Sequence, residues 1–141
     1  MKIDHFAFEV SDLDASLKFY VDKLGFKLET TFMDPQEHEI LAVVETAGGK
    51  LELIQVLDEN NQPQRFEPVI LRRHFCPHLA LQTDDIAGTL TCLRMHEIPL
   101  VRGPLDIPGL VKWFYICDPD QNVIEFFQDY SGTGSEIQHE K

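Results

Sequence analysis

The sequence has few of the residues that mark disulfide-stabilised or membrane-spanning chains. Only three of its 141 residues are cysteine, an odd number, and no two of them form a C-x-x-C pair. This usage predicts reduced thiols in a cytoplasmic protein. No stretch approaches the about 18 consecutive apolar residues of a membrane-spanning helix, and the first residues do not resemble an apolar targeting segment.

Basic residues are also scarce. Lysine and arginine total 12 against 24 acidic residues, which gives a formal net charge of −12. Nucleic acids and anionic membranes are bound by basic patches, so this balance disfavours both as partners. A small anionic substrate remains compatible with it, because such a substrate needs only one local cation. The hydrophobic content of 43% is sufficient for a folded core.

An internal repeat is the most informative feature that the sequence does contain. The segments that begin at His5 and His78 each continue with an apolar-small-apolar triplet and end in an acidic and an aliphatic residue. The offset between them is 73 residues (78 − 5), and the same offset relates Glu52 to Glu125. Each histidine therefore precedes a glutamate by 47 residues (52 − 5 and 125 − 78). We interpret the chain as a duplicated module with a His/Glu/His/Glu site between its halves.

Hydrophobic periodicity predicts the same βαβββ order in both halves. Strands are expected over 2–10, 26–33, 38–47 and 50–57, and again over 77–83, 100–101, 111–117 and 123–128. Helices are expected over 12–24, with Ser11 as the N-cap and Gly25 as the C-terminal cap, and over 85–96. The prediction is an α+β fold in which two tandem βαβββ modules form a cup-shaped, eight-stranded mixed sheet with helices on the convex side.

Composition suggests where the modules begin and end. The first module is expected over 1–57 and the second over 77–130, with a linker at 58–76 and a polar C-terminal tail at 131–141. The linker segment 66–75 is a candidate for a short helical turn, although Pro68 disfavours a helix there. The loop at 102–109 contains two glycines and two prolines and is predicted to be a lid.

Strand alternation directs four ligand-type side chains into the cup. His5 and Glu52 have the parity opposite to that of the apolar residues of their strands, and so do His78 and Glu125. Two neutral imidazoles and two carboxylates compensate the charge of a divalent cation and leave two positions of an octahedron open. The alternative is that these are ordinary strand-end histidines and solvent-facing glutamates. The repetition favours one divalent ion per site, which can be Ni, Co, Zn, Mn or Fe.

Four further residues are candidates for substrate contact. Phe127 shares the strand face of Glu125. Arg102, Lys112 and Arg72 are cations that can hold a substrate carboxylate, with a solvated surface role as the alternative for each. These four residues complete the expected site.

These residues resemble the vicinal oxygen chelate superfamily, which includes glyoxalase I, bleomycin-resistance proteins, extradiol dioxygenases and methylmalonyl-CoA epimerase. The resemblance covers a single domain at about 2–129, and its motifs lie at His5, 12–20, 24–28, 51–53, 78–81 and 118–125. The pattern is most similar to bacterial glyoxalase I (lactoylglutathione lyase). The two histidine and two glutamate ligands of that family correspond to His5, Glu52, His78 and Glu125. Two departures are Gln121, where glycine is usual, and the segment 72–77, which does not align with the usual glutathione contacts.

The resemblance implies a metal-dependent lyase that isomerises a hemithioacetal to a 2-hydroxy thioester by metal-stabilised enediolate chemistry. Glu125 is the expected base that moves a proton between neighbouring carbons, with Glu52 as the alternative. The expected substrate is a small glutathione adduct or another thiol adduct, and a homodimer is expected to bury the seam between half-cups. A metal-dependent epimerase of the methylmalonyl-CoA epimerase type and a non-catalytic, ligand-sequestering protein of the bleomycin-resistance type remain as alternatives.

Overall fold

The computed structural model describes residues 1–132, and these form two compact units. The first unit comprises Met1–Leu71 together with Asp118–Asn122, and the second comprises Arg72–Cys117 and the chain from Val123 onwards. The boundary after Leu71 falls inside the expected linker. The turn at 118–122 is grouped with the first unit, although the sequence suggested that it belongs to the second module. Most of the expected polar tail, residues 133–141, lies outside the described residues.

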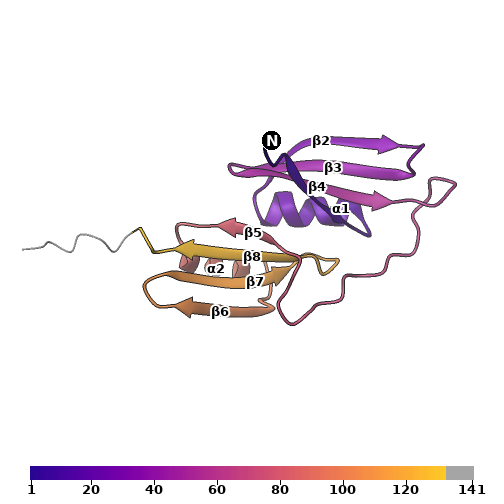
Figure 1. Cartoon of the computed structure of the whole chain (residues 1–141). Helices are drawn as coiled ribbons and strands as arrows, with labels where there is room; N and C mark the ends of the chain where they lie inside the picture. Colours follow the sequence, from indigo (N-terminus) through magenta and orange to yellow (C-terminus); the bar gives the residue numbers. More distant parts are fainter. Residues whose placement is uncertain (133–141) are drawn as a thin grey trace, which may run out of the picture. The chain divides into compact units, whose positions relative to one another are not determined.

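The first unit is a βαβββ module with a four-stranded mixed sheet in the order β1-β4-β3-β2 (Figure 1). Strand β1 runs parallel to β4, and the other neighbours are antiparallel. A short α-helix, α1, continues directly into a π-helical segment, η1. The elements are β1 His5–Glu9, α1 Leu13–Leu17, η1 Lys18–Lys23, β2 Lys27–Asp34, β3 Glu39–Thr46 and β4 Gly49–Val56.

The second unit repeats this topology with the sheet order β5-β8-β7-β6. Strand β5 is parallel to β8, and β8, β7 and β6 are antiparallel neighbours. The elements are β5 Leu79–Gln82, α2 Ile86–Met95, β6 Arg102–Ile107, β7 Val111–Cys117 and β8 Val123–Asp129. The predicted α+β class and the two βαβββ modules are therefore confirmed.

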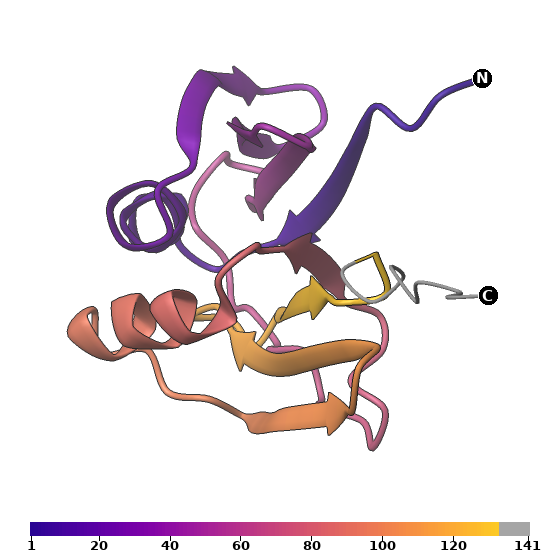
Figure 2. The ribbon, with the colours of Figure 1, turned by 90° about the vertical axis from the view of Figure 1, so that its left-hand side faces the viewer.

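The helix of each unit lies against one face of its own sheet (Figure 2). In the first unit this face is apolar and buried, and its members are Phe8, Ala42, Val44, Leu51 and Leu53. In the second unit the equivalent buried side chains are Phe114, Ile116 and Ile124. Because successive residues of a strand point to opposite faces, the histidine and glutamate of each module lie on the face away from the helix.

The prediction of a lid at 102–109 is wrong, because most of this segment pairs with β7 as strand β6. The register shifts between Arg102 and Leu105, where Gly103 and Pro104 interrupt the pairing. Strand β6 is an edge strand, and an edge tolerates a proline that donates no hydrogen bond. Gly103 has a φ of +102°, and a Cβ atom added there would lie 2.9 Å from the Cβ atom of Phe114. The glycine and proline thus shape a strand edge instead of a lid.

The linker has little regular structure. Residues 64–72 form no helix or strand, and the only feature within the candidate helical turn at 66–75 is a turn at 73–74. Pro68 lies where a helix would need both a backbone donor and room for the preceding turn. Within residues 1–132, no helix is long and apolar enough to cross a membrane.

The sequence predicted Ser11 as the N-cap of the first helix, but this prediction is wrong. The N-cap is Asp12. The Asp12 carboxylate accepts a hydrogen bond from the backbone N–H of Ala15 at 3.1 Å. Ser11 instead donates to the Asp120 carboxylate through its backbone N–H at 2.9 Å and through its hydroxyl at 2.6 Å. A carboxylate 109 residues away therefore outcompetes the local capping role of Ser11.

The turn between β7 and β8 is held to the first unit by buried hydrogen bonds. One oxygen of the Asp118 carboxylate accepts from the backbone N–H groups of Asp120 and Asn122, at 2.9 and 2.8 Å. The other oxygen accepts from the Tyr20 hydroxyl and the Asn122 amide, both at 2.9 Å. The same Asn122 amide donates to the Glu9 carbonyl at 3.0 Å. Burial raises the pKa of Asp118, and these hydrogen bonds act in the opposite direction.

Gln121 in this turn adopts the left-handed backbone conformation, with a φ of 66°. Side chains with a Cβ atom are disfavoured there, whereas glycine is not. We expect Gln121→Gly to raise the free energy of unfolding by about 0.5–1 kcal/mol, measured by urea denaturation. The matched control is Gln36→Gly, in a turn where the backbone φ is not positive and the same change should destabilise. Equal destabilisation by both changes would contradict the left-handed backbone conformation of Gln121.

Candidate functional site

Each unit brings one predicted histidine next to its predicted glutamate. The His5 Nε2 atom lies 3.4 Å from Glu52 Oε2, and the His78 Nε2 atom lies 2.8 Å from Glu125 Oε2. Strand pairing explains both pairs, because Ala7 is the register partner of Glu52 and Ala80 that of Glu125. Each histidine precedes its alanine by two residues and so shares the face of the glutamate. The repeated spacing thus produces the same local pair twice.

The second ring nitrogen of each histidine already has a hydrogen-bond partner. His5 Nδ1 lies 2.9 Å from an Asp4 carboxylate oxygen, and His78 Nδ1 lies 2.8 Å from the carbonyl oxygen of Phe75. Both partners only accept, so Nδ1 carries the proton and donates. In a neutral imidazole this leaves a lone pair on Nε2, on the side of the glutamate. Histidines that bind metals are commonly oriented in this way.

The separations within the pairs fit two neighbouring ligands of one ion. Two ligand atoms bound at about 2.1 Å and at a right angle are about 3 Å apart. The observed Nε2–Oε2 distances of 3.4 and 2.8 Å lie on either side of this value. Among residues 1–132, no three His, Cys, Asp or Glu side chains gather as a metal-binding group. Each pair by itself therefore offers two protein ligands.

Asp4 affects the protonation of the first pair. Its hydrogen bond raises the pKa of His5, burial opposes this, and the charge of Glu52 raises the pKa further. The same hydrogen bond lowers the pKa of Asp4. Because a metal ion and a proton compete for the same Nε2 lone pair, this pair is a better metal ligand as the pH rises.

Two of the substrate-contact candidates lie on the same face as Glu125. In the register of the second sheet, Arg102 is the partner of Tyr115, and Tyr115 is the partner of Glu125. Phe127 follows Glu125 by two residues, so its side chain is on that face as well. Arg102 is exposed and Phe127 is half-buried. Both are therefore placed where a ligand on this face can contact them.

The other two candidates are placed differently. Lys112 precedes the buried Phe114 by two residues, so it lies on the helix side of the sheet and not on the face of Glu125. The structure therefore does not support Lys112 as a residue that contacts a substrate next to Glu125. Arg72 is exposed at the start of the second unit, within the irregular segment that leads to His78.

Two aromatic residues that the sequence did not single out lie against His78. The Tyr115 ring meets the His78 ring edge-on, with centroids 5.6 Å apart, and Phe75 stacks on Tyr115 at 5.0 Å. Burial raises the pKa of Tyr115, and the charge of Glu125 adds to this effect. The sequence could have identified Tyr115, because it lies as far before the turn at 118–122 as Glu125 lies after it. Residues at equal distances from such a turn are partners in an antiparallel pair of strands. No comparable sequence signal exists for Phe75.

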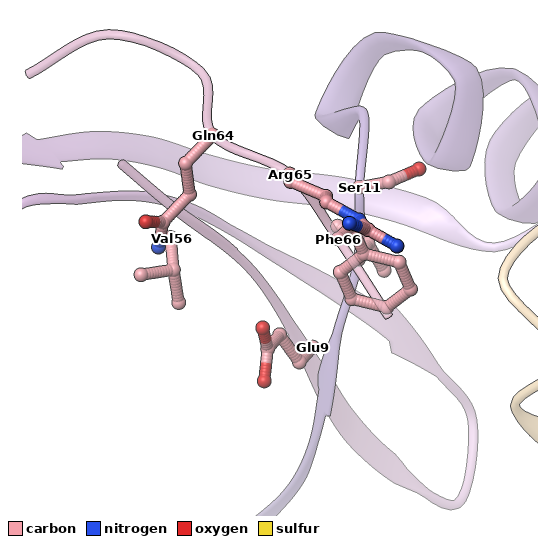
Figure 3. Close-up of a pocket in the computed structure, with 7 residues that line it drawn as sticks. Glu9, Ser11, Val56, Gln64, Arg65 and Phe66 are labelled. Carbon is pink, nitrogen blue, oxygen red and sulfur yellow. The ribbon is translucent and has the colours of Figure 1, made fainter. Parts of the chain in front are cut away.

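A small pocket lies at the end of β1 in the first unit, at the opposite end of this strand from His5 (Figure 3). It is lined by Glu9, Val10, Ser11, Val56, Gln64, Arg65 and Phe66. Its volume of about 10 Å³ admits about one water molecule. The pocket is therefore too small to receive an organic substrate.

Comparison with known proteins finds relatives that span nearly the whole chain. A model of the Glyoxalase/Bleomycin resistance protein/Dioxygenase superfamily matches residues 2–126. The lactoylglutathione lyase of Haemophilus influenzae is 31% identical over 133 residues, covering 93% of this chain and 95% of that protein. The uncharacterized protein YwbC of Bacillus subtilis is 30% identical over 128 residues, covering 90% and 97%. The solved structure of TnmS3, an antibiotic binding protein from Streptomyces, matches with a TM-score of 0.67 at 25% identity, covering 92% and 96%.

Proposed function

Because the chain belongs to the Glyoxalase/Bleomycin resistance protein/Dioxygenase superfamily, we propose that it is a metal-dependent lyase of the glyoxalase I type. Its substrate is the hemithioacetal of a 2-oxoaldehyde and a thiol, and its product is a 2-hydroxy thioester. The observation that carries this proposal is the pair formed twice by a histidine Nε2 and a glutamate carboxylate, at 3.4 and 2.8 Å. The 31% identity to a lactoylglutathione lyase supports the same activity.

The proposed ligands of the ion are His5, Glu52, His78 and Glu125. Two neutral imidazoles and two carboxylates balance a divalent charge, which suits Ni, Co, Zn, Mn or Fe. A bound divalent ion supplies a Lewis acid that stabilises negative charge on substrate oxygens. The two pairs come either from one chain or from two copies in a homodimer. Among residues 1–132 no disulfide joins the three cysteines, in keeping with the proposed place of the protein in the reducing cytoplasm.

Glu125 is the proposed base. Its side chain is 17% exposed, and its carboxylate lies 2.8 Å from the His78 ring. It removes the proton from the carbon that bears sulfur and hydroxyl, and it delivers a proton to the neighbouring carbonyl carbon. The first carbon is oxidised to the thioester and the second is reduced to the alcohol, so the isomerisation needs no external oxidant. Glu52 occupies the equivalent position in the first unit and is the alternative base.

The experiment that tests this function combines metal content with turnover. The purified chain is loaded with each of the five divalent metals, its bound metal is quantified, and it is assayed with methylglyoxal and glutathione. About one ion per site with turnover supports the proposal. Bound metal without turnover rejects the lyase and directs the assay to acyl-CoA epimers, the substrates of the epimerase alternative. No bound metal under any loading rejects the site itself.

Replacement of His78 by alanine is expected to weaken metal binding at least tenfold. The change removes one of four ligands, and even the loss of a residue that only orients a ligand costs 10–100-fold in affinity. The measurement is a competition titration against a metal-binding dye. The control is His96→Ala, which removes the half-buried histidine at the end of α2 and should leave affinity unchanged. Unchanged affinity in His78→Ala would remove this residue from the site.

A ligand-sequestering protein is the second candidate function. Its support is the likeness to the antibiotic binding protein TnmS3, at 25% identity and a TM-score of 0.67. Sub-stoichiometric metal together with tight binding of an organic ligand would favour this function over the lyase. The metal and turnover assay, together with a ligand-binding titration, therefore separates the two candidates.

A further inference from the structure

We propose that the second unit contains a binding subsite for an oxyanion group of the substrate, formed by Arg102, Phe75 and Tyr115 beside Glu125. The identification of its occupant as the substrate rests on the proposed function. The ability to bind a carboxylate or phosphate group is a property of the second unit itself. The substrate class is thus narrowed to thiol adducts that carry an anionic group close to the reacting carbons.

The position of the subsite follows from the sheet register. Arg102, Tyr115, Glu125 and Ala80 are successive partners across strands β6, β7, β8 and β5. Neighbouring strands are about 4.8 Å apart, so the Arg102 backbone lies roughly 10 Å from that of Glu125. The Arg102 guanidinium lies by the Phe75 ring, and this ring stacks on Tyr115, the register partner of Glu125. An anion held by Arg102 therefore belongs to a molecule whose reacting carbon can reach Glu125.

The Arg102 side chain is oriented by aromatic and backbone contacts. Its guanidinium carbon lies 5.8 Å from the centroid of the Phe75 ring, a distance at which a cation and a ring attract. Its Nη1 group donates to the Arg73 carbonyl at 3.4 Å. Phe75 in turn stacks on Tyr115 with an interplanar angle of 14°. A guanidinium held in this way keeps N–H groups available for a planar, bidentate oxyanion.

Phe75 links this subsite to the histidine of the metal pair. Its carbonyl accepts the hydrogen bond from His78 Nδ1 at 2.8 Å, while its ring contacts Arg102 and Tyr115. Its backbone has a φ of 54°, in the left-handed region that non-glycine residues seldom adopt. One residue thus positions both the candidate ligand and the candidate anion-binding group.

The local charge also favours an anion. Within residues 1–132, no carboxylate lies within 4.0 Å of Arg72, Arg73 or Arg102, whereas Arg65 pairs with Glu67 at 3.0 Å. Arg72, Arg73 and Arg102 are all exposed. Exposed guanidinium groups that are not held in ion pairs keep their charge available to a ligand, even in a chain with a net charge of −12. Such groups attract small anions.

The single tryptophan of the chain provides a direct readout. Trp113 precedes Tyr115 by two residues on β7, so it lies on the same face, and its register partner is Phe127. The test is a titration of the full chain with inorganic phosphate and with propionate, followed by Trp113 fluorescence, with uncharged propionamide as the reference ligand. The titrations are made with a chelator present and again after metal loading, because an anion can also bind a metal ion.

We expect saturable binding of at least one of the two anions and none of propionamide. Arg102→Gln should weaken the binding at least fivefold, and Arg102→Lys should weaken it less because it keeps the charge but loses the bidentate geometry. The control Arg94→Gln removes an exposed arginine from α2 and should leave the affinity unchanged. Phe75→Leu should also weaken binding, because it removes the ring that orients Arg102.

The result shows whether the bound anion is a phosphate or a carboxylate. It also tests the anion subsite separately from the proposed lyase activity. Tighter phosphate binding indicates a phosphorylated substrate, and tighter propionate binding indicates a carboxylate. Absence of saturable anion binding, or equal affinity in wild type and Arg102→Gln, overturns the subsite even if the chain turns over methylglyoxal and glutathione. Anion binding that depends on Arg102 in a chain without metal or turnover would keep the subsite and reject the lyase.

Discussion

Replacement of Glu125 by glutamine is expected to lower turnover by two to four orders of magnitude while the metal content stays the same. Glutamine keeps the shape of the side chain and one oxygen that can bind an ion, but it cannot accept the substrate proton. A positioned general base typically contributes about 10²–10⁴ to the rate. Turnover of the methylglyoxal–glutathione adduct and bound metal are measured on the same preparation, so that loss of the base is separated from loss of the ion.

Two further variants make this result specific. Glu59→Gln alters an exposed glutamate in the turn after β4 and should have no effect on turnover. Glu52→Gln tests the equivalent position of the first unit, where the glutamate lies 3.4 Å from its histidine. Turnover within about tenfold of wild type in metal-loaded Glu125→Gln would show that Glu125 is not the base. A larger loss in Glu52→Gln than in Glu125→Gln would transfer the role to Glu52.

Replacement of Asp118 by alanine is expected to lower the free energy of unfolding by about 3–5 kcal/mol. The side chain is only 5% exposed, and it accepts four hydrogen bonds. Its removal leaves the Tyr20 hydroxyl, the Asn122 amide and two backbone N–H groups without this acceptor in a buried place. Each buried donor that loses its partner costs about 1–3 kcal/mol, and partial access of water reduces the sum.

The measurement for Asp118→Ala is urea denaturation followed by circular dichroism. Asp106→Ala is the control, because Asp106 is exposed on the edge strand β6 and its loss should change stability by at most about 0.5 kcal/mol. Tyr20→Phe removes one of the four hydrogen bonds and should give an intermediate loss. A cost below about 1 kcal/mol for Asp118→Ala would mean that water replaces the carboxylate in this turn.

The parts of the fold that could be predicted are those encoded by local periodicity and by the repeat. Alternation of apolar and polar residues correctly placed the strands around Glu52 and Glu125, and the 73-residue offset predicted the same module twice. Parity also predicted that each histidine and glutamate lies on the face of its strand away from the apolar residues. The close approach of each histidine to its glutamate depends on the strand register, which only the structure gives.

The parts that could not be predicted depend on partners distant in sequence. Ser11 looked like a helix cap, but Asp120 binds it across 109 residues. The segment that begins at Arg102 looked like a lid, but an unpaired edge of β7 was available to it. Phe75 has no periodic pattern around it, and its place between Arg102 and Tyr115 depends on tertiary packing. The residues near each of these positions do not indicate which distant residue will bind there.

The turn at 118–122 has a consequence for how this chain can be divided. A fragment that ends at Leu71 loses the carboxylates that bind Ser11 and Tyr20, because these carboxylates lie in the turn between β7 and β8. A fragment that begins at Arg72 keeps the turn but exposes its buried acids to water. The first unit is therefore completed by a turn that lies between two strands of the second unit in the sequence. A circular permutant opened within the polar stretch at 58–62 retains every one of these bonds, so the chain should tolerate new termini there.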